Sequence, residues 1–350
     1  MIVPAPMLDA LARDIACQSA RWGSRVIIDP QAILDRSADL VLAPPGRSSP
    51  NGSCRLLQAA DGWIAVNLPR ADDWTLVLAW LESEAAVATW CDLEMAVVDR
   101  PVAELKERAV MLGLAVAIVG EVASDNDPMT PALAMGEPRS RAGLPVVADL
   151  TSLWAGPLCA GLLARGGASV TRYESARRPD PSRYAAPRFY ASLNQEKDHR
   201  LLDFQTSEGR AAVREAVSLA DIIVTSARPR AFSALGLDPA DLFAANPSLI
   251  WVAITGHGWQ GQSGQRVACG DDAAAAGGLL QWTEAGEPRF LGDALADPLT
   301  GLAAACAAMR AWMDGGGVLI DVALARVAAF AAAARYDMCE AGTSDAVSRH

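Results

Sequence analysis

Asp297 is the residue whose type and setting point most directly to chemistry. It is followed by Pro298 and Gly301 in the segment DALADPLTG, which leads into an apolar run ending at Met313. Asp and Pro are typical of a helix start, because Asp accepts the first N–H groups and Pro lacks one. The positive end of such a helix favours an ionised carboxylate. Asp297 is therefore either a helix cap or a nucleophile that forms a covalent acyl intermediate, while Gly301 leaves room for another backbone.

A glycine-rich stretch, AITGHGWQG at residues 253–261, is the second candidate for chemistry. Gly256 and Gly258 permit close backbone approach, and their N–H groups are candidates for stabilising a tetrahedral oxyanion. His257 offers a ring to line a pocket or to act as a general base, although a histidine on such a loop more often packs or faces solvent. Farther on, Asp271 and Asp272 precede an Ala/Gly-rich helix, where we expect a cap rather than a catalytic dyad.

The loop LTSLWAGP at residues 150–157 follows the first expected strand of a parallel sheet, where such sheets bind ligands. Trp154, Ala155 and Gly156 belong to it, and close packing of strand on helix is an equally good reading of Gly156. The loop lacks the GxGxxG spacing of dinucleotide dehydrogenases. Basic side chains cluster after it and form either a phosphate-binding rim or a solvated loop. They are Arg172, Arg177, Arg178, Arg183, Arg188, Lys197 and Arg200.

The elements that position these residues divide at a linker rich in Pro, Asp, Ser and Gly, residues 123–144. After it, short apolar runs alternate with helical patterns, which predicts an α/β fold with a doubly wound, Rossmann-like parallel sheet over residues 144–350. We expect residues 1–143 to form a smaller α+β domain plus the linker. Asp61-Gly62 predicts a hairpin there, residues 25–28 a strand, and the loop at 43–53 a boundary or a mobile lid.

Composition narrows the function classes. The 350 residues carry a net charge of −11, which argues against nucleic acid or an anionic membrane surface as partner. Seven scattered cysteines and three histidines offer no metal-ligand spacing, so no metal is expected, and reduced buried thiols predict a cytoplasmic protein. We expect neither a signal peptide nor a membrane span.

Five ordered blocks over residues 146–324 resemble the class III CoA-transferase family, which includes formyl-CoA and carnitine-type CoA-transferases and α-methylacyl-CoA racemase. They are VVADLTSLWAGPLCAGLLARGGASVTRYE (146–174), LNQEKDHRLLDFQTSEGR (193–210), DIIVTSARPRAFSALGL (221–237), NPSLIWVAITGHGWQG (246–261), and LADPLTGLAAACAAM (295–309) with GGGVLIDVAL (315–324).

The resemblance implies a reaction and roles for particular residues. In the family an Asp that opens the last helix attacks an acyl-CoA thioester, and CoA then passes through an aspartyl thioester to a second carboxylic acid; Asp297 occupies that position. Arg172, Lys197 and Arg200 are then expected to meet CoA phosphates, while Ala155 and Gly156 let the pantetheine pass. Coenzyme A would be a substrate, a small carboxylic acid its acceptor, and a homodimer or a heteromer with a related chain the assembly.

The chain also departs from the family pattern. Residues 50–69 and 105–125 resemble the small domain that usually follows the large domain's first half, yet here they come first. Trp154 stands where some transferases use Gln, Gln205 and Ala234 where basic residues grip CoA, and 315–317 reads Gly-Gly-Gly for Gly-Arg-Gly. An inactive CoA-binding or partner subunit is therefore the alternative. A racemase is disfavoured because no His precedes the Ala/Gly-rich helix.

Overall fold

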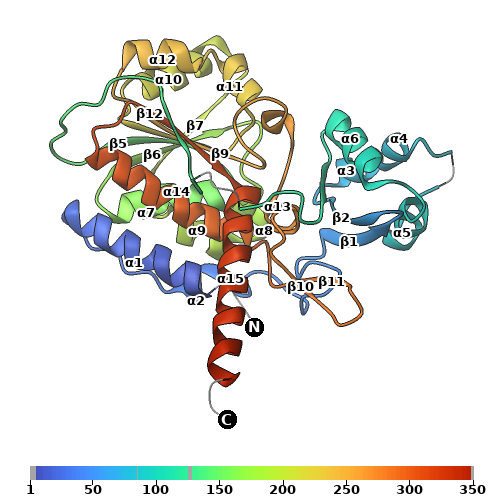
Figure 1. Cartoon of the computed structure of the whole chain (residues 1–350). Coiled ribbons are helices and arrows are strands. Elements are labelled where there is room, and N and C mark those ends of the chain that lie inside the picture. Colours follow the sequence, from blue (N-terminus) through green and yellow to red (C-terminus); the bar gives the residue numbers. More distant parts are fainter. Residues whose placement is uncertain (1–4, 85, 125–127, 348–350) are drawn as a thin grey trace.

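A seven-stranded sheet forms the centre of the larger body of the chain (Figure 1). The computed structural model describes residues 5–84, 86–124 and 128–347. Neighbouring strands are parallel except at one edge, where β4 runs antiparallel to β12. In spatial order the strands are β4 (Ala132–Ala134), β12 (Val318–Ala323), β9 (Ile250–Thr255), β8 (Ile222–Thr225), β5 (Val146–Leu150), β6 (Ser169–Ser175) and β7 (Asp198–Leu202). The expected α/β sheet is confirmed.

Both faces of this sheet are buried, because alternate residues of each central strand pack into different cores. In β9, Ile250, Val252 and Ile254 belong to one core, whereas Trp251 and Ala253 belong to the other. A parallel sheet covered on both faces requires such continuous apolar strands. This two-sided burial explains why the central strands could be predicted as short apolar runs.

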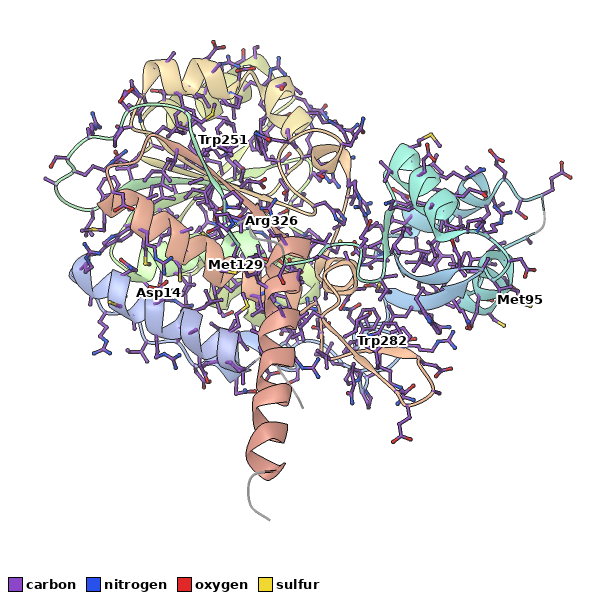
Figure 2. The ribbon with its side chains drawn as sticks, viewed as in Figure 1. Asp14, Met95, Met129, Trp251, Trp282 and Arg326 are labelled. Carbon is purple, nitrogen blue, oxygen red and sulfur yellow. The ribbon has the colours of Figure 1, made fainter. Side chains whose placement is uncertain are left out.

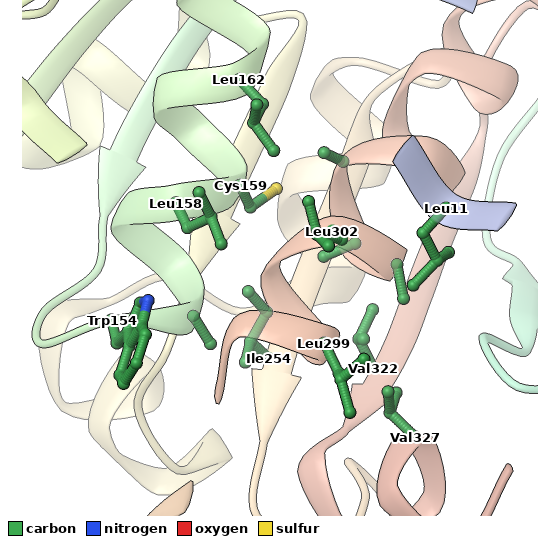
Figure 3. Packing of buried hydrophobic residues seen from close by; sticks show 14 of the residues in the cluster. Leu11, Trp154, Leu158, Cys159, Leu162, Ile254, Leu299, Leu302, Val322 and Val327 are labelled. Carbon is green, nitrogen blue, oxygen red and sulfur yellow. The ribbon is translucent and has the colours of Figure 1, made fainter. Parts of the chain in front are cut away.

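On the first face, α7 (Ala155–Arg165) and α14 (Ala296–Met313) pack directly on the strands. Outside them, α1 (Ala5–Arg21) packs on α14 and α9 (Pro187–Asn194) packs on α7, and residues of all these helices share the larger core. Figure 3 shows Leu158 and Cys159 of α7 facing α14, which carries Leu299 and Leu302. A side chain at Gly301 would lie 2.7 Å from the Ala155 carbonyl oxygen, so this glycine does admit another backbone, as expected. The tight crossing fixes α14 against the loop at the end of β5.

Another group of helices covers the second face of the sheet, at the top of Figure 1. They are α10 (Ser207–Ser218), α11 (Pro229–Leu235) and α12 (Pro239–Ala245). Thr206 and Asp238 cap α10 and α12 through their side-chain oxygens, so local sequence sets both starts. Their buried aromatic residues, Phe232 and Phe243, pack in the same core as Trp251 of β9.

A smaller antiparallel domain stands beside the sheet. The Asp61-Gly62 hairpin is confirmed, since Ala59 pairs with Gly62. The small sheet and its helices enclose a core of their own around Trp80 and Leu105. The elements are β1 (Cys54–Ala59), β2 (Gly62–Asn67), β3 (Ala115–Ile118), α3 (Ala71–Thr75), α4 (Val77–Leu81), α5 (Trp90–Val97) and α6 (Val102–Leu112). In Figure 2, Met95 of this domain lies far from Trp251 of the large sheet.

The helix α13 (Gly270–Ala276) joins the two bodies. Gly120 and Val122 donate backbone hydrogen bonds of 2.9 Å each to Ala275 and Ala276, and Ala275 packs with residues of β1 and β2. The remaining elements are α2 (Pro30–Leu34), α8 (Ser182–Ala185), the 3₁₀ turn Ser263–Gln265, the hairpin β10 (Leu280–Trp282) and β11 (Pro288–Phe290), and α15 (Leu324–Val347).

The division of the chain differs from the predicted boundary near residue 143. Leu8, Leu11 and Ile15 of α1 are buried in the core of the large sheet, not in the small domain. In Figure 1, α1 runs alongside α14. The linker also contributes β4, and residues 25–28 form no strand. Amphipathic spacing predicts that a helix packs, but it does not say against which body.

Candidate active site

Asp297 lies in the first turn of α14, with a free carboxylate. The helix begins at Ala296 after the N-cap residue Leu295, so Asp297 is the second helical residue and does not cap. Its side chain is half-buried and makes no hydrogen bond within the described part of the chain. One carboxylate oxygen faces Gly270 so closely that a side chain at that position would collide with it and with the Ala294 carbonyl oxygen. The expectation of a helix cap is wrong, and a carboxylate able to react remains.

Three further carboxylates surround Asp297, and burial dominates their electrostatics. Burial raises the pKa of Asp297 to about 7, that of Asp271 to about 6 and that of Asp272 to about 7. The neighbouring carboxylates, including Asp293, raise the pKa of Asp297 further, and Arg36 opposes them. Burial thus favours the protonated form of Asp297, Asp271 and Asp272 over the ionised form, compared with an exposed aspartate. Four adjacent acids can then coexist in one buried site.

Asp271 and Asp272 each accept a hydrogen bond from a backbone N–H, and Asp272 caps the following helix as expected. Asp272 accepts the Cys269 N–H at 2.9 Å and so closes a capping box at the start of α13, while Asp271 accepts the Ala294 N–H at 2.8 Å. The second bond ties the start of α13 to the loop before α14. Ala294 itself has φ of 46°, a conformation that favours glycine, so this loop is held in a strained shape.

Residues of the first 70 positions complete the site, and sequence reasoning missed them. The guanidinium of Arg36 donates to Asp293 from Nε and from Nη2, at 2.8 and 2.5 Å. Asn51 donates from Nδ2 to both Asp271 and Asp293, at 2.7 Å each. Asn67 of β2 donates to Asp272 at 2.8 Å. The loop expected to be a boundary or a mobile lid thus delivers Asn51 into the acidic cluster.

The predicted CoA-binding roles of Arg172 and Lys197 are contradicted by their burial. Both side chains are fully enclosed. Lys197 donates to Asp149 at 2.8 Å and to the Pro157 carbonyl at 2.9 Å. Arg172 binds Asp180 at 2.7 Å. These cations neutralise buried carboxylates at the ends of β5 and β6, so they stabilise the scaffold. Arg200 on the edge strand β7 is exposed, and its contact with CoA stays a prediction.

The β5–α7 loop is likewise packed rather than open. Trp154 and Ala155 are buried. The rings of Trp154 and Phe189 pack edge to face, with 4.9 Å between their centroids. Gly156 is required because a side chain there would collide with Thr151. Close strand–helix packing therefore accounts for this glycine, and the role of Ala155 and Gly156 in letting the pantetheine pass stays a prediction.

The glycine-rich loop after β9 is also committed to internal contacts. Gly258 donates its N–H to Thr255 Oγ1 at 3.0 Å, so it is not a free oxyanion donor. A side chain at Gly256 would lie 2.6 Å from Ala268, so packing explains this glycine too. His257 is buried, and desolvation lowers its pKa to about 3. It is neutral and sits within the domain junction near Glu121 rather than lining an open pocket.

The structure contains two cavities of note, and the second of them borders the loop before Asp297. A polar cleft of about 380 Å³ lies between the two bodies and is lined by three arginines, Arg70, Arg228 and Arg230. A more apolar cavity of about 330 Å³ is bounded by residues of α2, the 42–50 loop, and Gly292, Asp293 and Leu295. No cluster of three metal-ligating side chains occurs among the described residues. The same residues contain no helix with the length and hydropathy that crossing a bilayer requires.

Comparison with known proteins decides the family. A family model described as CoA-transferase family III matches residues 142–349. The chain belongs to this family. The match begins just before β5 and includes the β5–α7 loop, the glycine-rich loop and Asp297, whereas Arg36, Asn51 and the small domain precede it. The match to CoA-transferase family III therefore covers the large sheet except for its edge strand β4.

Relatives of the family III chain are named as CoA-transferases. Succinyl-CoA:glutarate CoA-transferase of Homo sapiens is 31% identical over 188 residues, covering 50% of this chain and 43% of that protein. Succinyl-CoA–D-citramalate CoA-transferase of Chloroflexus aurantiacus is 30% identical over 193 residues, covering 51% and 48%. The chain thus spans about half the length of the curated relatives it matches.

A solved structure shares the fold. The crystal structure of a hypothetical protein, Rv3272, from Mycobacterium tuberculosis superposes with a TM-score of 0.50 at 28% sequence identity. The alignment covers 55% of this chain and 57% of that one. The likeness extends over little more than half of either chain, which agrees with the matched large sheet.

Proposed function

We propose that this protein transfers CoA between an acyl-CoA and a carboxylic acid, with Asp297 as the covalent nucleophile. The observation that carries the proposal is the Asp297 carboxylate, which is half-buried, unbonded within the described residues and placed on a rigid helix start. Family membership and relatives named as CoA-transferases support the reaction class.

The arginine-lined cleft supports binding of the CoA phosphates. Desolvation lowers the pKa of Arg228, and the positive charges of Arg230 and Arg70 lower it further. Asp72 and Asp73 also line the cleft and Arg70 is paired with Asp73, so the positive charge left for a ligand is that of Arg228 and Arg230. An anion there would relieve this repulsion. Arg70 and Asp297 both act electrostatically on the Cys269 thiol, which places the cleft and the nucleophile in the same part of the molecule. CoA bound by its phosphates in the cleft would extend its thioester toward Asp297.

The chemistry uses one carboxylate and conserves the energy of the thioester. A carboxylate oxygen of Asp297 attacks the thioester carbon, the C–S bond breaks, and CoA leaves as a thiolate from an aspartyl anhydride. The thiolate then attacks the Asp297 carbonyl carbon, which releases the donor acid as a carboxylate and leaves an aspartyl-CoA thioester. The acceptor carboxylate then attacks the aspartyl-CoA thioester and CoA leaves again, which gives a second anhydride. The CoA thiolate attacks the acceptor carbonyl of this anhydride, so the new acyl-CoA forms and Asp297 is freed as a carboxylate. The raised pKa of Asp297 makes its ionised form a stronger nucleophile than an ordinary aspartate.

The setting of the enzyme is also a proposal. We propose a homodimer or a heteromer with a related chain as the assembly, as the family resemblance implies, and a relative named as the beta subunit of a succinyl-CoA–L-malate CoA-transferase supports the heteromer. Cys17, Cys54, Cys91, Cys159, Cys269 and Cys306 are free thiols, which fits a reducing cytoplasm.

An isotope-exchange assay tests the proposal. Hexanoyl-CoA and isotope-labelled hexanoate are incubated with the protein, and mass spectrometry follows the label into the CoA ester. We expect exchange with the unmodified chain and a loss of about a thousandfold or more in Asp297→Asn, because the amide cannot form the anhydride. Asp314→Asn, at the exposed end of the same helix, is the matched control and should keep full activity. Unchanged exchange in Asp297→Asn would refute the role of Asp297.

A further inference from the structure

Arg36 stands out because most of its hydrogen-bonding capacity is unused in a nearly closed site. A guanidinium has five N–H donors. Two of them, on Nε and Nη2, bind the same Asp293 oxygen, and no described residue accepts from the other three. The side chain is only 16% exposed. Nη1, which carries two of these three donors, is not fully buried, so a ligand or water can reach it and accept its hydrogen bonds.

The surroundings hold this guanidinium in place. Its central carbon lies 4.5 Å from the centre of the Trp154 ring and 5.5 Å from that of Phe189. Stacking on aromatic faces together with the Asp293 bonds orients the free donors rigidly. The positive charge of Arg36 lowers the pKa of Asp297, so the guanidinium lies close enough to act on the nucleophile. The cation is therefore built into the nucleophile's immediate environment.

The cavity beside the Arg36–Asp293 pair has a different character. Its apolar lining comes from Leu34, Leu42, Ala43, Pro45, Pro50 and Leu295. The charged members of the lining are Asp35 and Asp293, and it contains no cation. The volume of about 330 Å³ is at the lower end of the range for ligand pockets. A second carboxylate placed here would face acids and hydrocarbon, which opposes its entry.

We propose that Arg36 anchors the reacting carboxylate of the acceptor and that this cavity takes its hydrocarbon part. The preferred acceptors are therefore short to medium monocarboxylic acids, in contrast to the dicarboxylate substrates in the names of the relatives. This inference rests on the proposed function and gives it a substrate class. Held by the free N–H donors, the acceptor carboxylate attacks the carbonyl carbon of the aspartyl-CoA thioester, the C–S bond breaks, and CoA leaves as a thiolate.

Acids of equal length and different charge test the cavity. Hexanoate and adipate, each with six carbons, are compared as acceptors with one acyl-CoA donor. We expect kcat/KM to favour hexanoate by roughly a hundredfold, because adipate must bury its second carboxylate. Leu42→Lys, which adds a cation to the cavity lining at a half-buried position, should narrow or reverse that preference. Equal or better use of adipate by the unmodified chain would overturn the inference.

Variants of Arg36 test the anchor. Arg36→Gln should raise KM for hexanoate by roughly ten- to hundredfold, the value of a charge-assisted hydrogen bond, with a smaller effect on kcat. Arg36→Lys should raise KM for hexanoate less than Arg36→Gln does. Arg25→Gln, at an exposed position of the same segment, should leave KM and kcat unchanged. The covalent adduct formed from acyl-CoA alone should persist in Arg36→Gln. Persistence of the adduct with an unchanged KM refutes the anchor only, whereas absence of an adduct in the unmodified chain refutes the proposed function.

Discussion

Asp272 shows how one buried acid shapes stability as well as the site. Its Oδ1 accepts from Asn67 Nδ2 and from the Cys269 N–H, whereas its Oδ2 and the side-chain oxygen Oδ1 of Asn67 are both buried without a described partner. Burial raises its pKa from 3.8 to about 7. The folded state therefore keeps a proton that the unfolded chain loses between these two values.

The pH dependence of Asp272→Asn follows from that shift. Because the pKa of Asp272 is higher in the folded state, its protonation adds to the free energy of unfolding. This contribution is fully present below pH 3.8 and is lost as the pH rises through about 7. Asn cannot ionise, so its free energy of unfolding relative to the unmodified chain should improve by about 2 to 3 kcal/mol between pH 5 and pH 8. Urea denaturation at both pH values measures it. The exposed Asp241→Asn should show no such change, and a pH-independent difference for Asp272→Asn would contradict a raised pKa.

At the scale of elements, the ends of β5 and β6 are joined to α9 by a buried ion network. Asp149 accepts from Lys197 at 2.8 Å and lies 3.6 Å from Arg172, which also binds Asp180. Asp180 in turn accepts the Leu153 N–H at 2.9 Å and so holds the β5–α7 loop. Each charge is enclosed and opposed, so removal of one partner leaves a buried ion uncompensated.

Lys197→Met measures the strength of this network. It should lower the free energy of unfolding by about 3 to 5 kcal/mol, because Asp149 keeps one close cation in place of two. The urea midpoint at a constant m-value reports it. Arg200→Met on the neighbouring exposed strand should stay within about 0.5 kcal/mol. If the two variants unfold at the same urea concentration, the network does not hold these elements together.

The crossing of α7 and α14 gives a second test at this scale. Gly301→Ala places a methyl group 2.7 Å from the Ala155 carbonyl oxygen and 2.9 Å from Leu158, so the helices must separate. We expect a loss of about 1 to 3 kcal/mol in the free energy of unfolding. Ala307→Ser, half-buried on the same helix, should lose less. An unaltered thermal midpoint for Gly301→Ala would show that α14 and Asp297 are less tightly fixed than the structure implies.

At the scale of the whole molecule, sequence patterns predicted the central strands of the sheet better than its edge strands. The strands β8 and β9 are apolar throughout and could be recognised. The edge strand β7 reads DHRLL and is mostly exposed, so no apolar run marks it. The edge strand β4 has three residues and was hidden in the linker. An edge strand is not buried on both faces, so its sequence lacks the continuous apolar run by which a central strand can be predicted.

The site was predictable where chemistry is local and unpredictable where it depends on long-range contacts. Asp297 could be found from its place at a helix start and from a family resemblance. Arg36 reaches Asp293 across 257 positions, and Asn51 reaches Asp271 across 220. No local pattern marks either residue, because each one reaches the site only through the tertiary packing of the loop that carries it. For the same reason, burial turned Arg172 and Lys197 from expected ligands into scaffold residues.

The most direct measurement locates the covalent adduct. The protein is incubated with hexanoyl-CoA, quenched in acid, digested and analysed by mass spectrometry. The account predicts an acyl or CoA adduct on the peptide that contains Asp297, its release by hydroxylamine, and its absence in Asp297→Asn. An adduct on another residue, or CoA transfer with no adduct on the Asp297 peptide, would contradict it.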